Sequence, residues 1–268
     1  GNLSKEQVVQ AREIVKNEGW WRGWECDEGV LNQCLDGHEP MDLATLISRV
    51  YVETSGMKGK VRWGDKTPIY ALDMPQLAAV FPQAKFIHLI RDARDVVISI
   101  RNAGWRDQDL RRICRMWSEF TRAAVMSGRA MNSSNYLELH YEDLVDDTER
   151  ELKRLCAFLG EDFEPAMLES HVSQKGEISV LTQQFHSKLH RKPSTSDTAR
   201  WKKELRPLEV ATIEAHLEPV MRLVGQAPAS GKGWKVLGLL SAFTANSLCW
   251  LQIWIQKARN RIFGERRE

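Results

Sequence analysis

The chain has 268 residues, of which 43% are hydrophobic and 28% are charged, and its formal net charge is +2. These values are ordinary for a globular protein and fit one α/β domain with additions. The charge is too balanced to indicate a nucleic-acid partner, whereas a polyanionic nucleotide needs only a local basic pocket.

The five cysteines are odd in number and widely spaced, and no Cys-x-x-Cys pair occurs. This pattern predicts reduced thiols in a cytosol-like compartment and no zinc site. Because no signal peptide or membrane anchor is visible, we expect a cytoplasmic protein.

The first predicted helix begins at a capping box, Ser-Lys-Glu-Gln at residues 4–7, and runs to about Asn17. Residues 19–24 then place three tryptophans between glycines. They fit either a lid packed on the domain edge or a stacking platform for an acceptor. A second helix begins after the capping residue Asp42. Its apolar face carries Leu43, Leu46, Ile47 and Val50.

A short strand is expected at residues 61–63, and a helix at 73–81. The apolar run 86–90 predicts a buried strand, which breaks at Arg91-Asp92 and continues as a helix. In such βα units, ligands sit just beyond the carboxyl ends of the strands. Arg91 stands there, and a guanidinium holds phosphate through two parallel bonds.

Ser99 follows eight residues after Arg91, inside the predicted helix. An arginine that folds back can share one anion with this hydroxyl. The alternative is that Arg91 belongs to a solvated helix start and that Ser99 is a polar core residue.

Further along the chain we expect a long helix at residues 109–131, a strand at 136–141 and a helix at 149–159. Residues 173–200 lack periodicity and are polar, which suits a lid over a nucleotide. Pro207 begins another helix, which Gly225 ends.

The segment 225–233, GQAPASGKG, has five residues between Gly225 and Gly231, where the loop motif has four, and no Ser or Thr after Lys232. It therefore fails as a nucleoside-triphosphate loop, and we interpret it as a linker. Residues 236–255 are uncharged but too polar to span a membrane well. This C-terminal region, residues 234–263, fits either an interfacial helix that contacts a membrane peripherally or a helix that packs on the domain or on a second subunit.

Three motifs occur in order: Trp-Gly-Asp-Lys-Thr-Pro at 63–68, KFIHLIRDARDVVISIR at 85–101 and Leu-Glu-Leu-His-Tyr-Glu-Asp-Leu at 137–144. Together they resemble the sulfotransferases that use 3′-phosphoadenosine 5′-phosphosulfate (PAPS) and release 3′-phosphoadenosine 5′-phosphate (PAP). The resemblance covers roughly residues 60–205. It implies an α/β fold with a parallel sheet flanked by helices, similar to the P-loop NTPases, in a domain spanning residues 1–225. Residues 226–268 would then form a C-terminal linker and helix.

The resemblance also implies roles for individual residues, without a metal. Arg91 and Ser99 would hold the 3′-phosphate, and Tyr141 would contact the adenosine half. Lys66 would be the catalytic cation. Two residues of the late basic segment (198–205) would close over the donor phosphates, namely Arg200 and Lys203. The alternatives are that Lys66 is a surface lysine paired with Asp65 and that Tyr141 is a core tyrosine.

The chain departs from the family pattern in two places. Pro68 occupies the position of the base of cytosolic members, and neither Asp65 nor His88 matches a family base. We expect His88 to be a core histidine. The loop that cradles the 5′-phosphosulfate is not visible in residues 1–62. We therefore expect it to precede residue 1, and we expect the chain as given to be weakly active or inactive.

The favoured hypothesis is transfer of a sulfuryl group from PAPS to a hydroxyl or amine of a small-molecule or glycan acceptor. One alternative is a nucleotide kinase-like phosphotransferase, although it would need an intact Walker loop and Mg²⁺ ligands that we do not find. The other is a non-catalytic membrane-associated or dimeric binding protein on a degenerate sulfotransferase fold.

Overall fold

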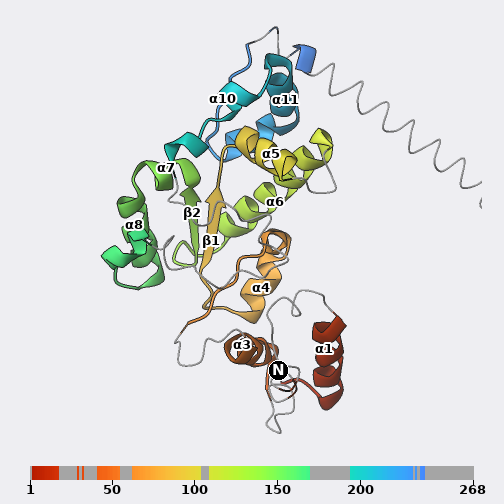
Figure 1. Cartoon of the computed structure of the whole chain (residues 1–268). Helices are drawn as coiled ribbons and strands as arrows, with labels where there is room; N and C mark the ends of the chain where they lie inside the picture. The colour runs from red at the N-terminus through yellow and green to blue at the C-terminus, as the bar shows by residue number, and fades with distance from the viewer. Residues whose placement is uncertain are drawn as a thin grey trace, which may run out of the picture. The chain divides into compact units, whose positions relative to one another are not determined.

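The computed structural model describes residues 2–17, 29, 32, 41–54, 62–103, 109–169, 194–231, 233 and 236–238. The chain divides into two compact units, which we describe separately (Figure 1). The first unit comprises residues 1–85 and 164–192, and the second comprises residues 86–163 and 193–268.

The first unit is helical in its described part. Its elements are α1 (Lys5–Asn17), α3 (Leu43–Thr54), the 3-10 helix η2 (Pro68–Leu72), α4 (Met74–Val80) and the 3-10 helix η3 (Pro165–Glu169). The predicted capping box begins α1: the Gln7 amide donates to the Ser4 hydroxyl at 3.2 Å, and the Ser4 amide donates to the Gln7 side chain at 2.8 Å. The carboxylate of Asp42 accepts the Thr45 amide at 2.8 Å and begins α3, as predicted.

A small apolar cluster joins α1 and α3: Met41, Leu46 and Val50 are buried, and Leu3 and Ala11 pack against them. Leu43 is 40% exposed, so the apolar face of α3 is narrower than the sequence predicts. The prediction of a strand at residues 61–63 is wrong for Arg62 and Trp63, because residues 62–67 belong to neither a helix nor a strand.

The second unit contains a pair of parallel strands with helices around it. Its elements are β1 (Phe86–Ile90), α5 (Ala93–Asn102), α6 (Leu110–Ala130), β2 (Tyr136–His140), α7 (Tyr141–Asp146), α8 (Thr148–Leu159), the 3-10 helix η5 (Thr195–Asp197), α10 (Trp201–Glu204) and α11 (Pro207–Leu223). In the register of the two strands, Ile90 lies opposite His140. A parallel pair flanked by helices confirms the predicted α/β class.

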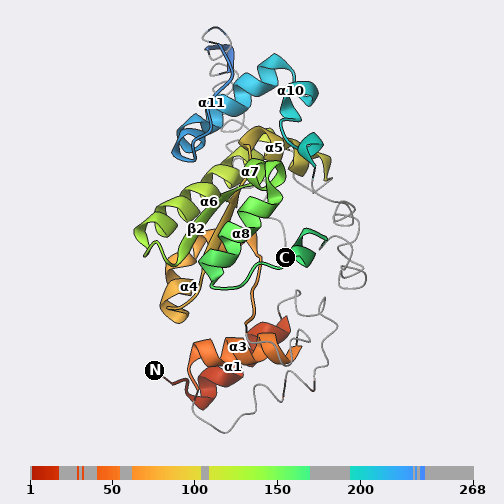
Figure 2. The ribbon, with the colours of Figure 1, turned by 90° about the vertical axis from the view of Figure 1, so that its left-hand side faces the viewer.

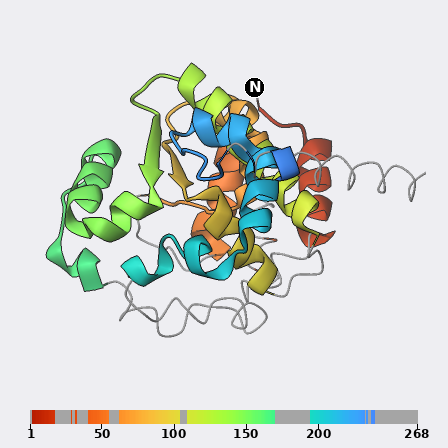
Figure 3. The same cartoon turned by 90° about the horizontal axis from the view of Figure 1, so that it is seen from above.

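The helices lie on both sides of the strand pair. Figures 1 and 3 show α8 on the β2 side and α6 on the other. Figure 2 shows α10 and α11 beside α5. The core of the unit joins α5, α6 and α11 through fully buried side chains that include Val97, Ile98, Val125, Ile213 and Leu217. This core fixes the helix that follows β1, and thereby the position of Arg91 between the two elements.

The prediction that residues 86–90 are buried throughout is wrong for Ile87 and Leu89, which are 42% and 52% exposed. Both point to the same face because side chains alternate along a strand. Ile90, on the opposite face, is 2% exposed and packs in the core with side chains of α5, α6 and α11.

Other sequence predictions are confirmed at their boundaries. Asp109 caps α6 by accepting the Arg111 amide, and Gly160 ends α8 in the left-handed conformation with φ 72°. The prediction for residues 19–24 lies outside the described residues, as do residues 173–193 of the predicted lid and residues 239–263 of the predicted C-terminal helix. Within the described ranges, no helix is long and apolar enough to cross a bilayer.

Candidate functional site

Arg91 follows the carboxyl end of β1, and Tyr141 follows the end of β2. Because the strands are parallel and Ile90 pairs with His140, these two residues emerge at the same edge. The Arg91 guanidinium lies over the Tyr141 ring, 4.7 Å from its centroid. The structure therefore brings together two of the residues predicted to bind the nucleotide.

The Arg91 side chain also reaches the residue that precedes the late basic segment. Its Nη2 donates to the Asp197 carbonyl at 2.6 Å. Its Nε is buried and has no hydrogen-bond partner among the described residues. A buried donor without an acceptor is costly, and a bound phosphate oxygen would satisfy it. Arg91 thus fits an anion site.

Ser99 lies in α5, two turns after Arg91, and is partly buried. In the part of the chain that the structure describes, no hydrogen bond joins its hydroxyl to the Arg91 guanidinium. The two residues share one strand-to-helix unit, and the role of Ser99 stays a prediction.

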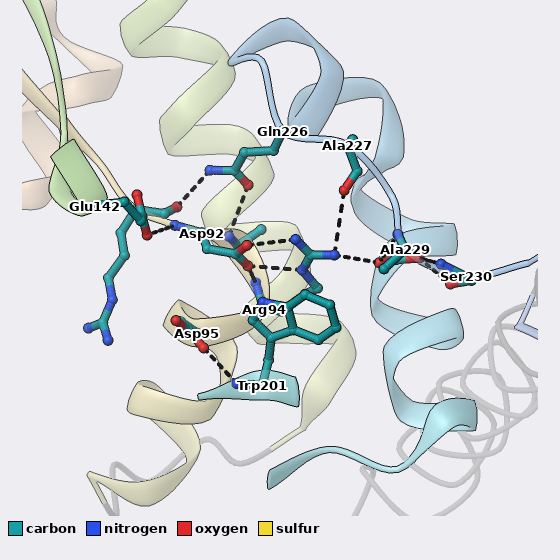
Figure 4. Close-up of polar contacts among 12 residues, drawn as sticks. Asp92, Arg94, Asp95, Glu142, Trp201, Gln226, Ala227, Ala229 and Ser230 are labelled. Carbon is teal, nitrogen blue, oxygen red and sulfur yellow. Dashed lines mark hydrogen bonds and ion pairs between the residues drawn. The ribbon is translucent and has the colours of Figure 1, made fainter. Parts of the chain in front are cut away.

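The late basic segment is anchored to α5 by a buried carboxylate. Asp95 is 1% exposed, and its Oδ1 accepts the Trp201 amide at 2.8 Å (Figure 4). Burial raises the pKa of Asp95. Its Oδ2 is buried without a partner among the described residues. This contact holds the start of α10 against the helix that follows Arg91.

The two predicted basic residues of this segment have different surroundings. Arg200 is partly buried and pairs with Glu204, with Nε 2.7 Å from the carboxylate. Lys203 is exposed. Ala199, which precedes Arg200, has a φ of 52°, a left-handed conformation that costs a non-glycine residue about 1 kcal/mol. Their contact with donor phosphates stays a prediction.

Lys66 belongs to the first unit and is exposed. The neighbouring Asp65 carboxylate accepts the Thr67 hydroxyl at 3.1 Å. Among the described residues, no ion pair joins Lys66 to Asp65. The alternative, in which Lys66 is a surface lysine paired with Asp65, therefore lacks the ion pair that it requires.

Asp65 faces a small group of aromatic side chains in the same unit. Tyr51 stacks on Trp63 with ring centroids 4.3 Å apart, and the Tyr51 and Tyr70 hydroxyls are 3.5 Å apart. Burial, chiefly, and the Asp65 charge raise the pKa of Tyr51 and Tyr70. These contacts fix the segment that carries Lys66.

His88, which we expected in the core, is partly buried and hydrogen bonded. Its Nδ1 lies 2.9 Å from the Tyr136 hydroxyl, which donates in turn to Glu138 at 3.2 Å. Burial lowers the pKa of His88 to about 4. A ring that is neutral and engaged in this way has no evident part in the anion site.

The sequence reasoning missed a buried ionic cluster behind the site. Arg94 donates to Asp92 at 2.6 Å and to Glu214 at 2.7 Å, and its guanidinium lies 3.8 Å from the Trp201 ring centroid (Figure 4). Glu214 also accepts the amides of Ala229 and Ser230 at 2.8 and 2.9 Å. Residues 229–230, inside the segment that we interpreted as a linker, are thus hydrogen bonded to α11.

No local pattern marks this cluster, because Arg94 reads as an ordinary charge near a helix start. Within the described residues, no group of three or more His, Cys, Asp or Glu side chains is placed to hold a metal ion. Arg91 and Tyr141 give the site a cation and an aromatic ring, and both suit an anionic nucleotide.

The sequence profile of the Sulfotransferase family matches residues 7–165, more than half of the 268 residues. The chain belongs to the sulfotransferase family. Solved structures agree on the fold. A sulfotransferase domain from the curacin biosynthetic pathway superposes with a TM-score of 0.59 at 18% identity, covering 83% of this chain and 79% of that domain. A sulfotransferase domain from the Synechococcus PCC 7002 olefin synthase gives 0.51 at 22% identity, covering 75% and 76%. The α/β sulfotransferase fold is thereby confirmed.

Curated relatives include protein-tyrosine sulfotransferase A of Caenorhabditis elegans. It is 25% identical over 170 residues, which are 61% of this chain and 44% of the relative. The omega-hydroxy-beta-dihydromenaquinone-9 sulfotransferase of Mycobacterium tuberculosis is 32% identical over 112 residues, 37% of this chain and 29% of the relative. This sulfotransferase-family chain therefore spans less than half the length of either relative.

Proposed function

We propose that this chain binds PAPS and takes part in transfer of its sulfuryl group to a hydroxyl or amine acceptor. Membership of the sulfotransferase family supports the proposal. The observation that carries it is the placement of Arg91, over the Tyr141 ring and with a buried Nε that lacks an acceptor among the described residues. A guanidinium in this state provides charge and an open donor for a phosphate.

The residues have separate roles in this proposal. Arg91 and Ser99 hold the 3′-phosphate, and the Tyr141 ring contacts the adenosine half. Arg200 and Lys203 contact the donor phosphates from the late basic segment. Because the 3′-phosphate is remote from the reacting bond, its binding energy sets the position of the donor and selects it over other adenine nucleotides.

In the proposed reaction, the acceptor oxygen or nitrogen attacks sulfur. The bond from sulfur to the bridging oxygen of the 5′-phosphate breaks, and PAP leaves with that electron pair. The acceptor proton passes to a base or to solvent. Lys66 stabilises the negative charge that develops on the bridging oxygen, since its flexible ammonium can follow the charge as it moves. The exposure of Lys66 and the engagement of Asp65 by Thr67 support this role.

The names of the relatives support a hydroxyl acceptor. One relative is named for protein tyrosine and another for an omega-hydroxy menaquinone. Both names describe an O–H group that receives the sulfuryl group. We therefore narrow the proposal for this chain to a hydroxyl-bearing acceptor, either a small molecule or a side chain of a protein.

The test is a thermal-shift series with PAP, ADP and ATP. A ligand that binds only the folded chain stabilises it, by about 2.7 kcal/mol at one hundred times its dissociation constant. We expect stabilisation by PAP and much less by ADP or ATP. Equal shifts with ATP and PAP would favour the kinase-like alternative, and the absence of any shift with PAP would contradict the proposal.

A further inference from the structure

At the corner between β1 and α5, side chains accept the backbone amides of residues 92–94. The Asp92 amide donates to Glu142 at 2.9 Å, and the Ala93 amide donates to Gln226 at 3.0 Å (Figure 4). The next amide, of Arg94, donates to the Asp92 carboxylate at 2.9 Å. A helix N-terminus often binds anions through such amides. Here they are already engaged, so an anion at this corner depends on the side chain of Arg91.

Gln226 holds this corner at both ends. Its Oε1 accepts the Ala93 amide, and its Nε2 donates to the Arg91 carbonyl, both at 3.0 Å. A single side-chain amide thus spans the two peptide groups that flank Asp92. Because the two bonds restrain the backbone around Arg91, they also restrain the direction in which the Arg91 side chain leaves it.

The end of α11 places Gln226 in this position. Gly225 adopts φ 76°, and its amide donates to the Arg222 carbonyl at 3.1 Å. The Gln226 amide donates to the Met221 carbonyl at 2.8 Å. These two bonds form a Schellman cap, which favours glycine at the left-handed position. Met221 is fully buried in the core, so the cap ties Gln226 to the rigid centre of the unit.

The chain beyond Gln226 is held as well. Glu214 lies on α11, is 1% exposed and accepts the amides of Ala229 and Ser230. Gln226 is therefore restrained on both sides, by the helix cap before it and by Glu214 after it. Because Gln226 is restrained in this way, its two hydrogen bonds also restrain the backbone of Arg91 and Ala93.

We propose that Gln226 is a positioning residue for Arg91, one that aligns the guanidinium with the 3′-phosphate of the donor nucleotide. This inference rests on the proposed function. It assigns a role to a residue outside the range that the family profile matches, 7–165. Gln226 itself does not contact the nucleotide in this account; it acts through the backbone of Arg91.

The test compares PAP with AMP, which differ only by the 3′-phosphate, in binding to Gln226→Leu and Gln226→Glu. The leucine variant loses both hydrogen bonds, while its side chain is similar in size to that of glutamine. The glutamate variant keeps an acceptor for the Ala93 amide but cannot donate to the Arg91 carbonyl. We expect the preference for PAP over AMP to fall about tenfold in the leucine variant and by less in the glutamate variant, with little change in AMP affinity.

Gln76→Leu is a matched control, since Gln76 is an exposed glutamine on α4. It should keep the PAP preference of the parent chain. An unchanged preference in both Gln226 variants, or an equal loss of PAP and AMP binding, would overturn the positioning role. If the leucine variant does not fold, the ratio of PAP to AMP affinity in the glutamate variant tests the positioning role. A parent chain without any PAP preference would instead refute the proposed function, and this inference with it.

Discussion

The guanidinium of Arg94 donates to the carboxylate of Glu214 at 2.7 Å, although the two residues are 120 positions apart in the chain. Their side chains are only 6% and 1% exposed. This buried pair joins the helix that follows Arg91 to α11 and to the chain beyond it. Burial by itself would raise the pKa of Glu214, but the bonds from Ala229, Ser230 and Arg94 hold it below its usual value.

The first prediction concerns this pair. Glu214→Ala leaves the Arg94 charge buried with only part of its partners, and we expect unfolding free energy to fall by about 3–5 kcal/mol. Urea denaturation followed by circular dichroism measures the change. Glu218→Ala on the same helix removes an exposed pair with Arg222 and should cost about 0–1 kcal/mol. Equal losses in the two variants would contradict the structural role of the buried pair.

Gly128 lies against the ring of Tyr136, and a β-carbon at this position would overlap the ring. We expect Gly128→Ala to destabilise the chain by about 1–3 kcal/mol, because α6 or the ring must shift. Gly231→Ala is the control, since a β-carbon there meets no atom within 4 Å. A melting temperature of Gly128→Ala equal to that of the control would show that α6 and β2 do not approach as described.

Acid should destabilise the fold partly through His88. Burial lowers the pKa of His88 from 6.5 to about 4, so between these values the unfolded chain binds more protons than the folded chain. Stability is therefore present above pH 6.5 and is lost as the pH falls toward 4. His88→Gln should reduce the slope of unfolding free energy against pH in this window. An identical slope in both proteins would exclude His88 as a source of the acid effect.

Tyr141 should contribute to nucleotide binding through its ring. Tyr141→Ala removes the surface on which the Arg91 guanidinium rests, and we expect PAP affinity to fall about fivefold. Tyr141→Phe keeps the ring and should bind PAP nearly as the parent does. Isothermal titration measures both. If the phenylalanine variant loses as much affinity as the alanine variant, the hydroxyl is the contributing group and the ring contact is not.

Local signals in the sequence predicted most element boundaries. The Ser4–Gln7 box and the Asp42 cap each act through bonds within a few residues, so the sequence alone reveals them. The strand-to-helix change after Ile90 was predictable for the same reason, and with it the place of Arg91 at the strand end.

What the sequence did not reveal depends on contacts between distant segments. Arg94 and Glu214 carry no local sign that they pair, and Gln226 reads as one polar residue in a Gly- and Pro-containing stretch. The exposure of Ile87 and Leu89 is equally invisible, because an apolar run predicts burial without saying what covers it. Positions that act through tertiary contacts therefore required the structure.

The most direct measurement is isothermal titration of PAP into the parent chain, Arg91→Ala and Arg222→Ala. The last variant removes an arginine that is 61% exposed on α11, and serves as a charge-matched control. We predict that the parent and the control bind PAP with the same affinity and that Arg91→Ala binds at least tenfold more weakly. Equal PAP affinity in all three proteins would contradict the assignment of Arg91 to the 3′-phosphate.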